Sequence, residues 1–288
     1  MHLGHRAVIG RALEYSAHGL SPAVFTFVTN SVEIKHEQTF RYIVDNEQKL
    51  EMMRRMGVSD IYCPDFREIK ELSAEEFARD ILCGRLAAKK VICGYAFRFG
   101  NKALCGIEEL RALGVKYGFE AVSVPPVYLD GSVISSTAIR KCIEDGDIAR
   151  ANMLLGYSYG ITGAVVHGFE IGRTIDFPTI NQSFGENQLI PRFGAYASQT
   201  FADGKKYSSV TNIGIKPTVG VRTAPLAETH IIGYNGDLYG KKISVELIDF
   251  IRPERKFSSL EELKGAIADD VRKTEELLGF PEKQTKGK

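Results

Sequence analysis

The sequence has no tryptophan, no long hydrophobic run and almost no net charge. The missing tryptophan excludes nothing by itself. No apolar stretch reaches the roughly 18 residues that a membrane-spanning helix needs, and the first residues lack the segments of a signal peptide. Lysine and arginine total 37 and aspartate and glutamate 36, so the net charge of +1 gives no excess for binding a polyanion. We therefore expect a cytoplasmic protein that binds neither membranes nor nucleic acids.

Cysteine is also scarce, with five residues that all lie in the first half of the chain. No two of them are closer than ten residues in sequence, which argues against the closely paired cysteines typical of zinc sites and dithiol centres. We expect reduced, structural thiols. Hydrophobic residues make up 44% and charged residues 25% of the 288 positions, which excludes a disordered chain and favours two globular domains.

Helix and strand patterns alternate in the first half of the chain. Helical patterns cover residues 5–18, 46–56, 73–86 and 107–117, and β-rich runs cover residues 22–28, 60–63, 90–93 and 120–124. Ser73 and Glu76 have the spacing of a helix capping box. Strands separated by helices predict a parallel, doubly wound sheet.

The pattern changes after residue 156. Short runs rich in valine, isoleucine, tyrosine and threonine follow one another without helices between them, at residues 161–167, 194–201, 207–213, 228–234 and 243–250. Five or six such strands predict a small antiparallel barrel. Ser259 and Glu262 then predict the start of a last amphipathic helix that ends at Leu278. We expect a domain boundary near residues 156–160, which gives domains of 1–157 and 158–288.

The chain opens with His2-Leu3-Gly4-His5, immediately before the first predicted helix. Two imidazoles at a helix N-terminus would direct hydrogen-bond donors to a place where free backbone N–H groups already favour an anion, such as the phosphates of a nucleotide. In an α/β sheet such a loop normally follows a strand, and no strand pattern precedes it here. Taken alone, four residues near the start of a chain are better explained without a function.

Two further segments of the first half carry possible ligand-binding residues. In residues 94–100 (Gly-Tyr-Ala-Phe-Arg-Phe-Gly), the glycines allow a ligand to approach the backbone, and an aromatic ring and a guanidinium could contact it. A purely structural, aromatic-anchored loop fits that pattern equally well. In residues 134–140 (Ile-Ser-Ser-Thr-Ala-Ile-Arg), the hydroxyls can cap the next helix or, with the arginine, hold a pyrophosphate. The candidates in these segments are Gly94, Phe97, Arg98, Gly100, Ser136, Thr137 and Arg140.

The second half holds a glycine loop at residues 168–173 and a Phe-Pro-Thr-Ile-Asn segment at residues 177–181. A flexible loop followed by a rigid bend would place a hydroxyl and an amide beside a metal–nucleotide complex, although a simple barrel turn is the alternative. The candidates here are Gly168, Gly172, Arg173, Pro178, Thr179 and Asn181. Glu228 lies in an otherwise apolar and β-branched strand, where a carboxylate is either a solvated edge residue or a general base near a hydroxyl.

Together these segments resemble those of the bacterial bifunctional riboflavin kinase/FMN adenylyltransferases, also called FAD synthetases. The resemblance covers essentially the whole chain, and it includes residues 212–218 (Asn-Ile-Gly-Ile-Lys-Pro-Thr), 228–230 (Glu-Thr-His) and 237–240 (Asp-Leu-Tyr-Gly). It implies an α/β plus β architecture. The first domain would be a Rossmann-like nucleotidylyltransferase domain that lacks its first strand, and the second a small antiparallel riboflavin kinase barrel with a C-terminal helix.

The resemblance also implies two reactions, with riboflavin, FMN and ATP as substrates and Mg²⁺ accompanying ATP. In the first, the residue matching Glu228 acts as base while riboflavin attacks the γ-phosphate, and Thr179 and Asn181 lie at the Mg–ATP site. In the second, FMN attacks the α-phosphate of another ATP. The departing pyrophosphate would then be held by His2, His5 and Arg140, with Ser136 and Thr137 as hydroxyl donors. The loop residues named above would contribute to nucleotide and flavin binding.

Some residues depart from the family pattern. Family members begin with a strand and a Gly-x-Phe-Asp-Gly turn before the His-x-Gly-His segment, so we expect Met1 to be internal to the natural protein and the neighbouring strand edges to be exposed. Ala96 stands where the family usually has aspartate, and residues 28–31 (Val-Thr-Asn-Ser) replace a usual acidic, proline and histidine run. Asp176 replaces a common glycine. Two alternatives follow: a riboflavin kinase with a degenerate or truncated adenylyltransferase domain, or a non-catalytic flavin or nucleotide sensor.

Overall fold

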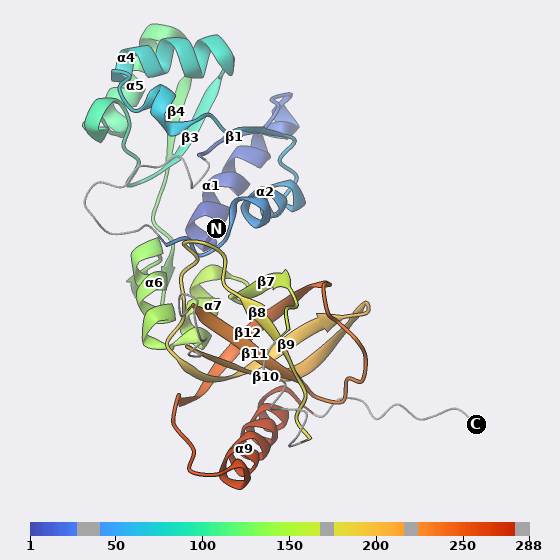
Figure 1. The fold of residues 1–288 in the computed structure, drawn as a ribbon. Coiled ribbons are helices and arrows are strands. Elements are labelled where there is room, and N and C mark those ends of the chain that lie inside the picture. The colour runs from blue at the N-terminus through green and yellow to red at the C-terminus, as the bar shows by residue number, and fades with distance from the viewer. Residues whose placement is uncertain (28–40, 168–175, 216–223, 280–288) are drawn as a thin grey trace. The chain divides into compact units, whose positions relative to one another are not determined.

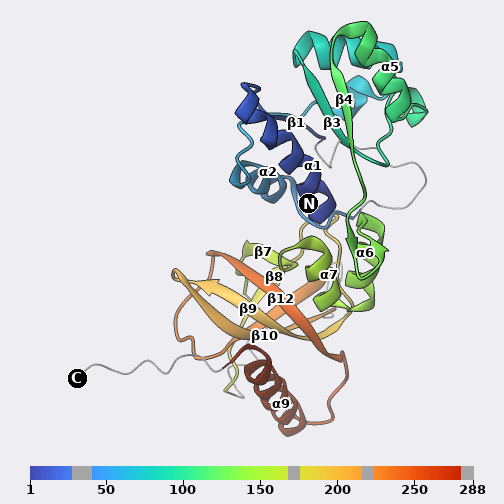
Figure 2. The same ribbon diagram turned by 180° about the vertical axis from the view of Figure 1, so that it is seen from behind.

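The computed structural model describes residues 1–27, 41–167, 176–215 and 224–279, and the chain forms two compact units (Figures 1 and 2). The first unit is Met1–Ser136 and the second is Thr137–Lys288. By their contacts, helices α6 (Ser136–Asp145) and α7 (Ile148–Leu155) therefore belong to the second unit, apart from Ser136. The division of functions at residues 157/158 stays a prediction.

The first unit contains the alternating helices and strands that the sequence predicts. Its helices are α1 (Leu3–Leu13), α2 (Asn46–Arg55), α3 (Phe66–Ile69), α4 (Ala74–Glu76), α5 (Ile107–Tyr117) and the helical segments η1 (Glu14–His18), η3 (Phe77–Arg85) and η4 (Asn101–Ala103). Its strands are β1 (Ala23–Phe25), β2 (Asp60–Tyr62), β3 (Lys90–Gly94), β4 (Glu120–Val124), β5 (Tyr128–Leu129) and β6 (Ser132–Val133). The predicted capping box is present, because Ser73 and Glu76 bond to each other's backbone N–H groups.

The parallel strands of this unit form two separate pairs. β1 pairs with β2 and β3 pairs with β4, and within the described residues no strand joins the two pairs. This arrangement agrees with the prediction of a doubly wound sheet that lacks one strand between neighbours. The short hairpin of β5 and β6 was not predicted, because two-residue strands leave no periodic pattern.

A hydrophobic core fixes η3 and α5 against the β3–β4 pair. Leu110 of α5 is fully buried in this core, and Phe77 of η3 meets Phe25 of β1 edge to face at 5.4 Å between ring centroids. Helix α5 approaches the following strand closely at Gly114, where a Cβ atom would overlap the backbone oxygen of Phe119. Only glycine fits this contact.

The second unit contains a six-stranded antiparallel barrel (Figure 1). Its strands are β7 (Gly160–Ala164), β8 (Thr179–Ser183), β9 (Gly194–Ala202), β10 (Lys205–Ile215), β11 (Pro225–Ile231) and β12 (Lys242–Pro253), in the order β7-β12-β9-β10-β11-β8. A bridge between Val166 and Asn181 brings the chain after β7 beside β8, so the barrel is nearly closed. The predicted barrel of five or six strands is confirmed.

Strand β8 corrects one local prediction. We interpreted residues 178–181 as a rigid bend, but Thr179–Ser183 pairs with β11 along its length. The sequence signal was weak, because asparagine, glutamine and serine have little preference for strands and a proline precedes them. Pairing with the neighbouring strand overrides that local preference.

The barrel interior contains a chain of buried hydroxyl groups. Ser198 bonds to Ser209 and Thr211 at 2.8 Å each, Thr200 bonds to Ser209 at 2.8 Å, and Thr211 bonds to Thr229 at 2.9 Å. All five residues are completely buried. Each hydroxyl has a partner, so burying them costs little, and the network fixes which residues of β11 face inward.

Helix α9 (Leu260–Leu278) packs against β9 and β10 (Figure 2). A buried ion pair holds it there. Asp270 of α9 is 2% exposed and accepts hydrogen bonds from Nε and Nη2 of Arg252, the latter at 2.8 Å. Ser259 caps the first turn by accepting from the backbone N–H of Glu262, as predicted.

Replacing Asp270 with alanine is expected to lower the free energy of unfolding of the barrel by about 3 kcal/mol, because the Arg252 guanidinium loses its buried partner. Urea denaturation measures the change. Asp269→Ala is the matched control, since Asp269 pairs with Arg272 at the exposed surface, where such pairs contribute less than about 1 kcal/mol. Equal losses in the two variants would contradict the prediction.

Candidate active sites

The kinase candidates of the second unit lie on two neighbouring strands. In the register of β8 and β11, Glu228 lies directly opposite Asn181 and His230 lies directly opposite Thr179. Residues directly opposite in an antiparallel pair project from the same face of the sheet, with Cβ atoms about 5 Å apart. Thr229 and Gln182, the next residues along each strand, are completely buried on the other face. The carboxylate, amide and hydroxyl of the predicted site are therefore brought together.

One side-chain oxygen of Asn181 has no hydrogen-bond partner among the described residues. The residue is 4% exposed, and its Oδ1 atom is buried with no partner among the described residues. Leaving such an oxygen unpaired costs about 1–3 kcal/mol in the folded state. An unpaired amide oxygen beside Glu228 and Thr179 can ligate a hard cation or accept a hydrogen bond from a hydroxyl group.

His230 contacts the two residues that immediately precede β8. Its Nδ1 atom lies 2.9 Å from the backbone oxygen of Pro178, and its ring meets Phe177 edge to face at 5.2 Å between centroids. A carbonyl oxygen only accepts, so Nδ1 carries the proton. Burial lowers the pKa of His230, which keeps the imidazole neutral and leaves a lone pair on Nε2.

Asp176, at the position where glycine is common in the family, has a left-handed backbone conformation. Its φ angle of +66° lies in the left-handed region, which aspartate tolerates better than most residues. Its carboxylate pairs with Nζ of Lys264 on α9 at 2.7 Å, and this bond lowers the pKa of Asp176. The departure from the family pattern is thus compatible with the same turn.

The glycine loop before this turn is outside the described residues, and so the predicted positions of Gly168, Gly172 and Arg173 are outside them too. Three residues of the second unit had received no predicted role. Asn212 of β10 lies directly opposite Glu228 on its other side, and the rings of His167 and Tyr239 stack at 3.9 Å between centroids. Asn212 can be identified as a neighbour of Glu228 only from the register of β10 with β11. Sequence periodicity alone does not predict that register.

In the first unit, His2 and His5 form the N-terminal cap of α1. The Nδ1 atom of His2 accepts a hydrogen bond from the backbone N–H of Gly4 at 3.1 Å, and Nδ1 of His5 accepts from the N–H of His2 at 3.3 Å. The two rings lie 3.8 Å apart between centroids. A Cβ atom at Gly4 would lie 3.0 Å from the His2 ring, so the glycine makes room for this cap.

Both imidazoles are neutral at pH 7. Burial lowers the pKa of His2 to about 3, with a smaller contribution from His5, and burial lowers the pKa of His5 to about 4. Because each Nδ1 accepts a backbone N–H, the single ring proton of each residue lies on Nε2. The pair therefore offers neutral N–H donors and not cations.

Part of the loop after β3 lies in the hydrophobic core of the first unit. Phe99 is buried, and its backbone exchanges two hydrogen bonds with Cys105. Phe97 stacks on it at 5.6 Å between centroids. Gly100 has a φ angle of +76°, and a Cβ atom there would press on the backbone of Ala74. The exposed Arg98 guanidinium lies against Gly106 at the start of α5.

The residues of the third predicted segment fall at the junction of the two units. Ser136 ends the first unit, whereas the exposed Thr137 and the half-buried Arg140 belong to the second. Burial lowers the pKa of Arg140 from a very high ordinary value, so its guanidinium stays charged. Gly94 ends β3 and begins the turn in which its carbonyl accepts from the N–H of Phe97.

Every helix of the described residues is too short or too polar to cross a bilayer.

A solved structure from Streptococcus pneumoniae, described as a macrolide-efflux protein, superposes with a TM-score of 0.84 at 30% identity. The match covers 95% of this chain and 90% of that chain. Family models described as FAD synthetase and riboflavin kinase match residues 1–138 and 155–278, respectively.

Curated relatives agree with the family models. The bifunctional riboflavin kinase/FMN adenylyltransferase of Escherichia coli K12 is 36% identical over 285 residues, which cover 97% of this chain and 90% of the relative. The protein with the same description from Bacillus subtilis is 32% identical over 290 residues, with coverage of 94% and 87%. The chain belongs to the family of bifunctional riboflavin kinase/FMN adenylyltransferases.

Proposed function

We propose that Glu228 is the general base of a riboflavin kinase site on the outer face of β8 and β11, and that Thr179 and Asn181 hold the metal–ATP complex there. The chain phosphorylates riboflavin to FMN with ATP and adenylylates FMN to FAD, as both family domains and the bifunctional relatives indicate. The observation that carries the site assignment is the strand register, which places Glu228 beside Asn181.

The kinase step requires a proton acceptor and a neutralised triphosphate. Glu228 would accept the proton of the terminal hydroxyl of riboflavin while that oxygen attacks the γ-phosphorus, and ADP departs. The side chains on this face contribute position more than covalent chemistry, which suits phosphoryl transfer. His230 would act as a positioning residue, because its bond to Pro178 fixes the backbone just before Thr179.

The donors at this site fit Mg²⁺ carried by ATP. The described residues contain no group of three or more histidine, cysteine, aspartate or glutamate side chains that could hold a metal by themselves. Magnesium in nucleotide sites is bound by substrate phosphates with only one or two protein ligands. The unpaired Oδ1 of Asn181 and the hydroxyl of Thr179 match that requirement, and Mg²⁺ would neutralise charge on the transferred phosphoryl group.

For the adenylyltransferase site we propose the residues of the first three motifs. His2 and His5 would donate Nε2–H groups to the departing pyrophosphate, Arg140 would supply positive charge, and Ser136 and Thr137 would supply hydroxyls. The loop residues Gly94, Phe97, Arg98 and Gly100 would contact nucleotide or flavin. Residues 1–157 would carry this activity and residues 158–288 the kinase, in a cytoplasmic protein. The family-model matches to residues 1–138 and 155–278 support that division.

Replacing Glu228 with glutamine is expected to reduce kcat for FMN formation from riboflavin by about 100- to 10,000-fold, the usual contribution of a general base. FAD formation from supplied FMN is expected to continue at the unmodified rate, because that reaction does not use Glu228. Quantifying flavin products from the two substrates separates the activities. Glu261→Gln on the exposed first turn of α9 is the control, and an unchanged kcat in Glu228→Gln would refute the assignment.

Replacing Asn181 with leucine is expected to raise the KM for Mg–ATP at least about tenfold while leaving the melting temperature unchanged or higher, since the substitution removes a buried oxygen that has no hydrogen-bond partner among the described residues. The neighbouring Gln182→Leu is the matched contrast. Nε2 of Gln182 donates to the backbone oxygens of Gly163 and Ile243, so that variant should lose stability. Calorimetry and a Mg–ATP titration measure both quantities, and a destabilised Asn181→Leu enzyme with normal KM would contradict the proposal.

The imidazoles of His2 and His5 are expected to remain neutral between pH 7.5 and 5.5, because their lowered pKa values lie below that range. Their Cε1–H signals in NMR spectra should therefore not shift over this interval. The assignments come from His2→Gln and His5→Gln variants. A titration midpoint near the ordinary histidine pKa of about 6.5 for either ring would show that the pair is cationic in part of this range.

A further inference from the structure

One row of residues crosses the outer face of the barrel from β8 to β12. In the register of β8, β11 and β10, Asn181, Glu228 and Asn212 lie directly opposite one another. The row continues through Ala195 of β9 to Arg252 of β12. Residues directly opposite in antiparallel strands project from the same face of the sheet. The proposed base therefore lies between two amide side chains, of which only Asn181 has a proposed role.

Helix α9 covers one end of this row. Asp270 of α9 accepts a hydrogen bond from Nη2 of Arg252 at 2.8 Å, and the helix packs against β9 and β10. Ala195 is 1% exposed, and Val210, which precedes Asn212 by two residues and shares its face, is 5% exposed. Asn212 itself is half-buried. The polar part of the row that α9 leaves uncovered therefore ends at Asn212.

The strand does not by itself explain an asparagine at position 212. Asparagine is depleted in strands, where it contributes little to packing. Thr211 and Ile213 are completely buried inside the barrel, so the amide of Asn212 lies on the outer face. The next outer-face position along β10 is Gly214, where a Cβ atom would overlap the carboxylate of Glu254. Asn212 is therefore the polar side chain that this part of β10 presents beside the proposed base.

The geometry of phosphoryl transfer assigns one side of the row to each substrate. The attacking and leaving oxygens lie roughly in line, on opposite sides of the transferred phosphorus. The inference rests on the proposed function, in which Asn181 holds Mg–ATP and Glu228 accepts the proton of the terminal hydroxyl of riboflavin. With the triphosphate on the Asn181 side, the carbon chain of riboflavin extends from Glu228 toward Asn212.

We propose that Asn212 binds the secondary hydroxyl next to the terminal hydroxyl of riboflavin, so that the kinase selects acceptors that carry a vicinal diol. Opposed residues have Cβ atoms about 5 Å apart, which brings the amide of Asn212 to the carbon adjacent to the reacting one. A hydroxyl both donates and accepts hydrogen bonds, and a primary amide offers an acceptor and two donors. This second contact would fix rotation about the terminal carbon–carbon bond and hold the attacking oxygen in line.

The test compares riboflavin with a deoxy analogue that lacks only this secondary hydroxyl. The unmodified full chain is expected to phosphorylate riboflavin with a kcat/KM at least about tenfold higher, because the analogue leaves the amide of Asn212 unpaired. Asn212→Val removes the amide and introduces a side chain that favours strands. This variant should use the two flavins with kcat/KM values within about threefold of each other, since the contact that distinguishes them is gone.

Two further variants complete the test. Gln199→Val is the matched control, because Gln199 is a half-buried amide on β9 that lies outside the row. Its neighbours Ser198 and Thr200 are completely buried, so it also projects from the outer face. Gln199→Val should keep the full preference for riboflavin. Asn212→Ala removes the amide without adding a branched side chain, and it should lose the preference as Asn212→Val does. Melting temperatures show that each variant is folded.

Three results would overturn the proposal. Equal use of the two flavins by the unmodified chain would show that this hydroxyl is not recognised. A preference that persists in both Asn212 variants would assign recognition to other residues. An equal loss of activity toward both flavins in those variants would show that Asn212 supports the site without contacting this hydroxyl.

The Glu228→Gln variant separates these results from a failure of the proposed kinase site. If Glu228→Gln loses FMN formation while Asn212→Val keeps the preference for riboflavin, only the role of Asn212 is wrong. If Glu228→Gln phosphorylates riboflavin at the unmodified rate, the site itself is wrongly assigned and the role of Asn212 is refuted with it.

Discussion

The proposed kinase site depends on the antiparallel register of β8 with β11. Because side chains alternate between the two faces of a strand, a shift of one residue would move Glu228 into the barrel and bring Thr229 to the outer face. The buried hydroxyl chain opposes that shift, since Thr229 bonds to Thr211 inside the barrel. The same interactions that satisfy the interior thus determine which side of the sheet presents the carboxylate.

The proposed site lowers the stability of the fold mainly through one atom, the unpaired Oδ1 of Asn181. Among the described residues, the buried side-chain polar atoms without a hydrogen-bond partner are Oδ1 of Asn181, on the outer face of β8, and Oε1 of Gln182, on its inner face. Gln182 keeps two hydrogen bonds through its Nε2 atom and so has a structural role. The oxygen of Asn181 has no hydrogen-bond partner among the described residues, and the proposed Mg–ATP ligand would supply one. An unfavourable buried group beside a potential base is more readily explained by function than by stability.

Sequence reasoning predicted elements with strong local signals and failed where pairing decides the structure. The helix boundaries marked by Ser73, Gly118 and Ser259 follow from capping and from the left-handed conformation that glycine adopts. Strand β8 was missed because its polar residues form a strand only through their contact with β11. Asn212 was missed for the same reason, since only the register of three neighbouring strands places it beside Glu228. The candidate site could be predicted as a set of motifs, but not as one face of a sheet.

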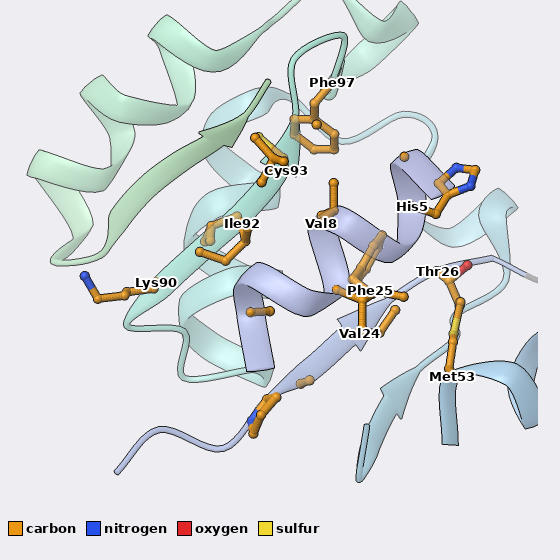
Figure 3. A pocket seen from close by; sticks show the side chains of 18 of the residues that line it. His5, Val8, Val24, Phe25, Thr26, Met53, Lys90, Ile92, Cys93 and Phe97 are labelled. Atoms are coloured by element: carbon orange, nitrogen blue, oxygen red, sulfur yellow. The ribbon is translucent and has the colours of Figure 1, made fainter. Parts of the chain in front are cut away.

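The two units differ in how many of their strand edges are paired. In the barrel, nearly complete closure leaves few strand edges, and the bridge between Val166 and Asn181 pairs part of the last one. In the first unit, a cavity of about 730 Å³ is lined by residues of both β1 and β3, and no ladder joins these two strands in the described residues (Figure 3). Helix α1 covers that cavity and carries His2 and His5 at its N-terminus.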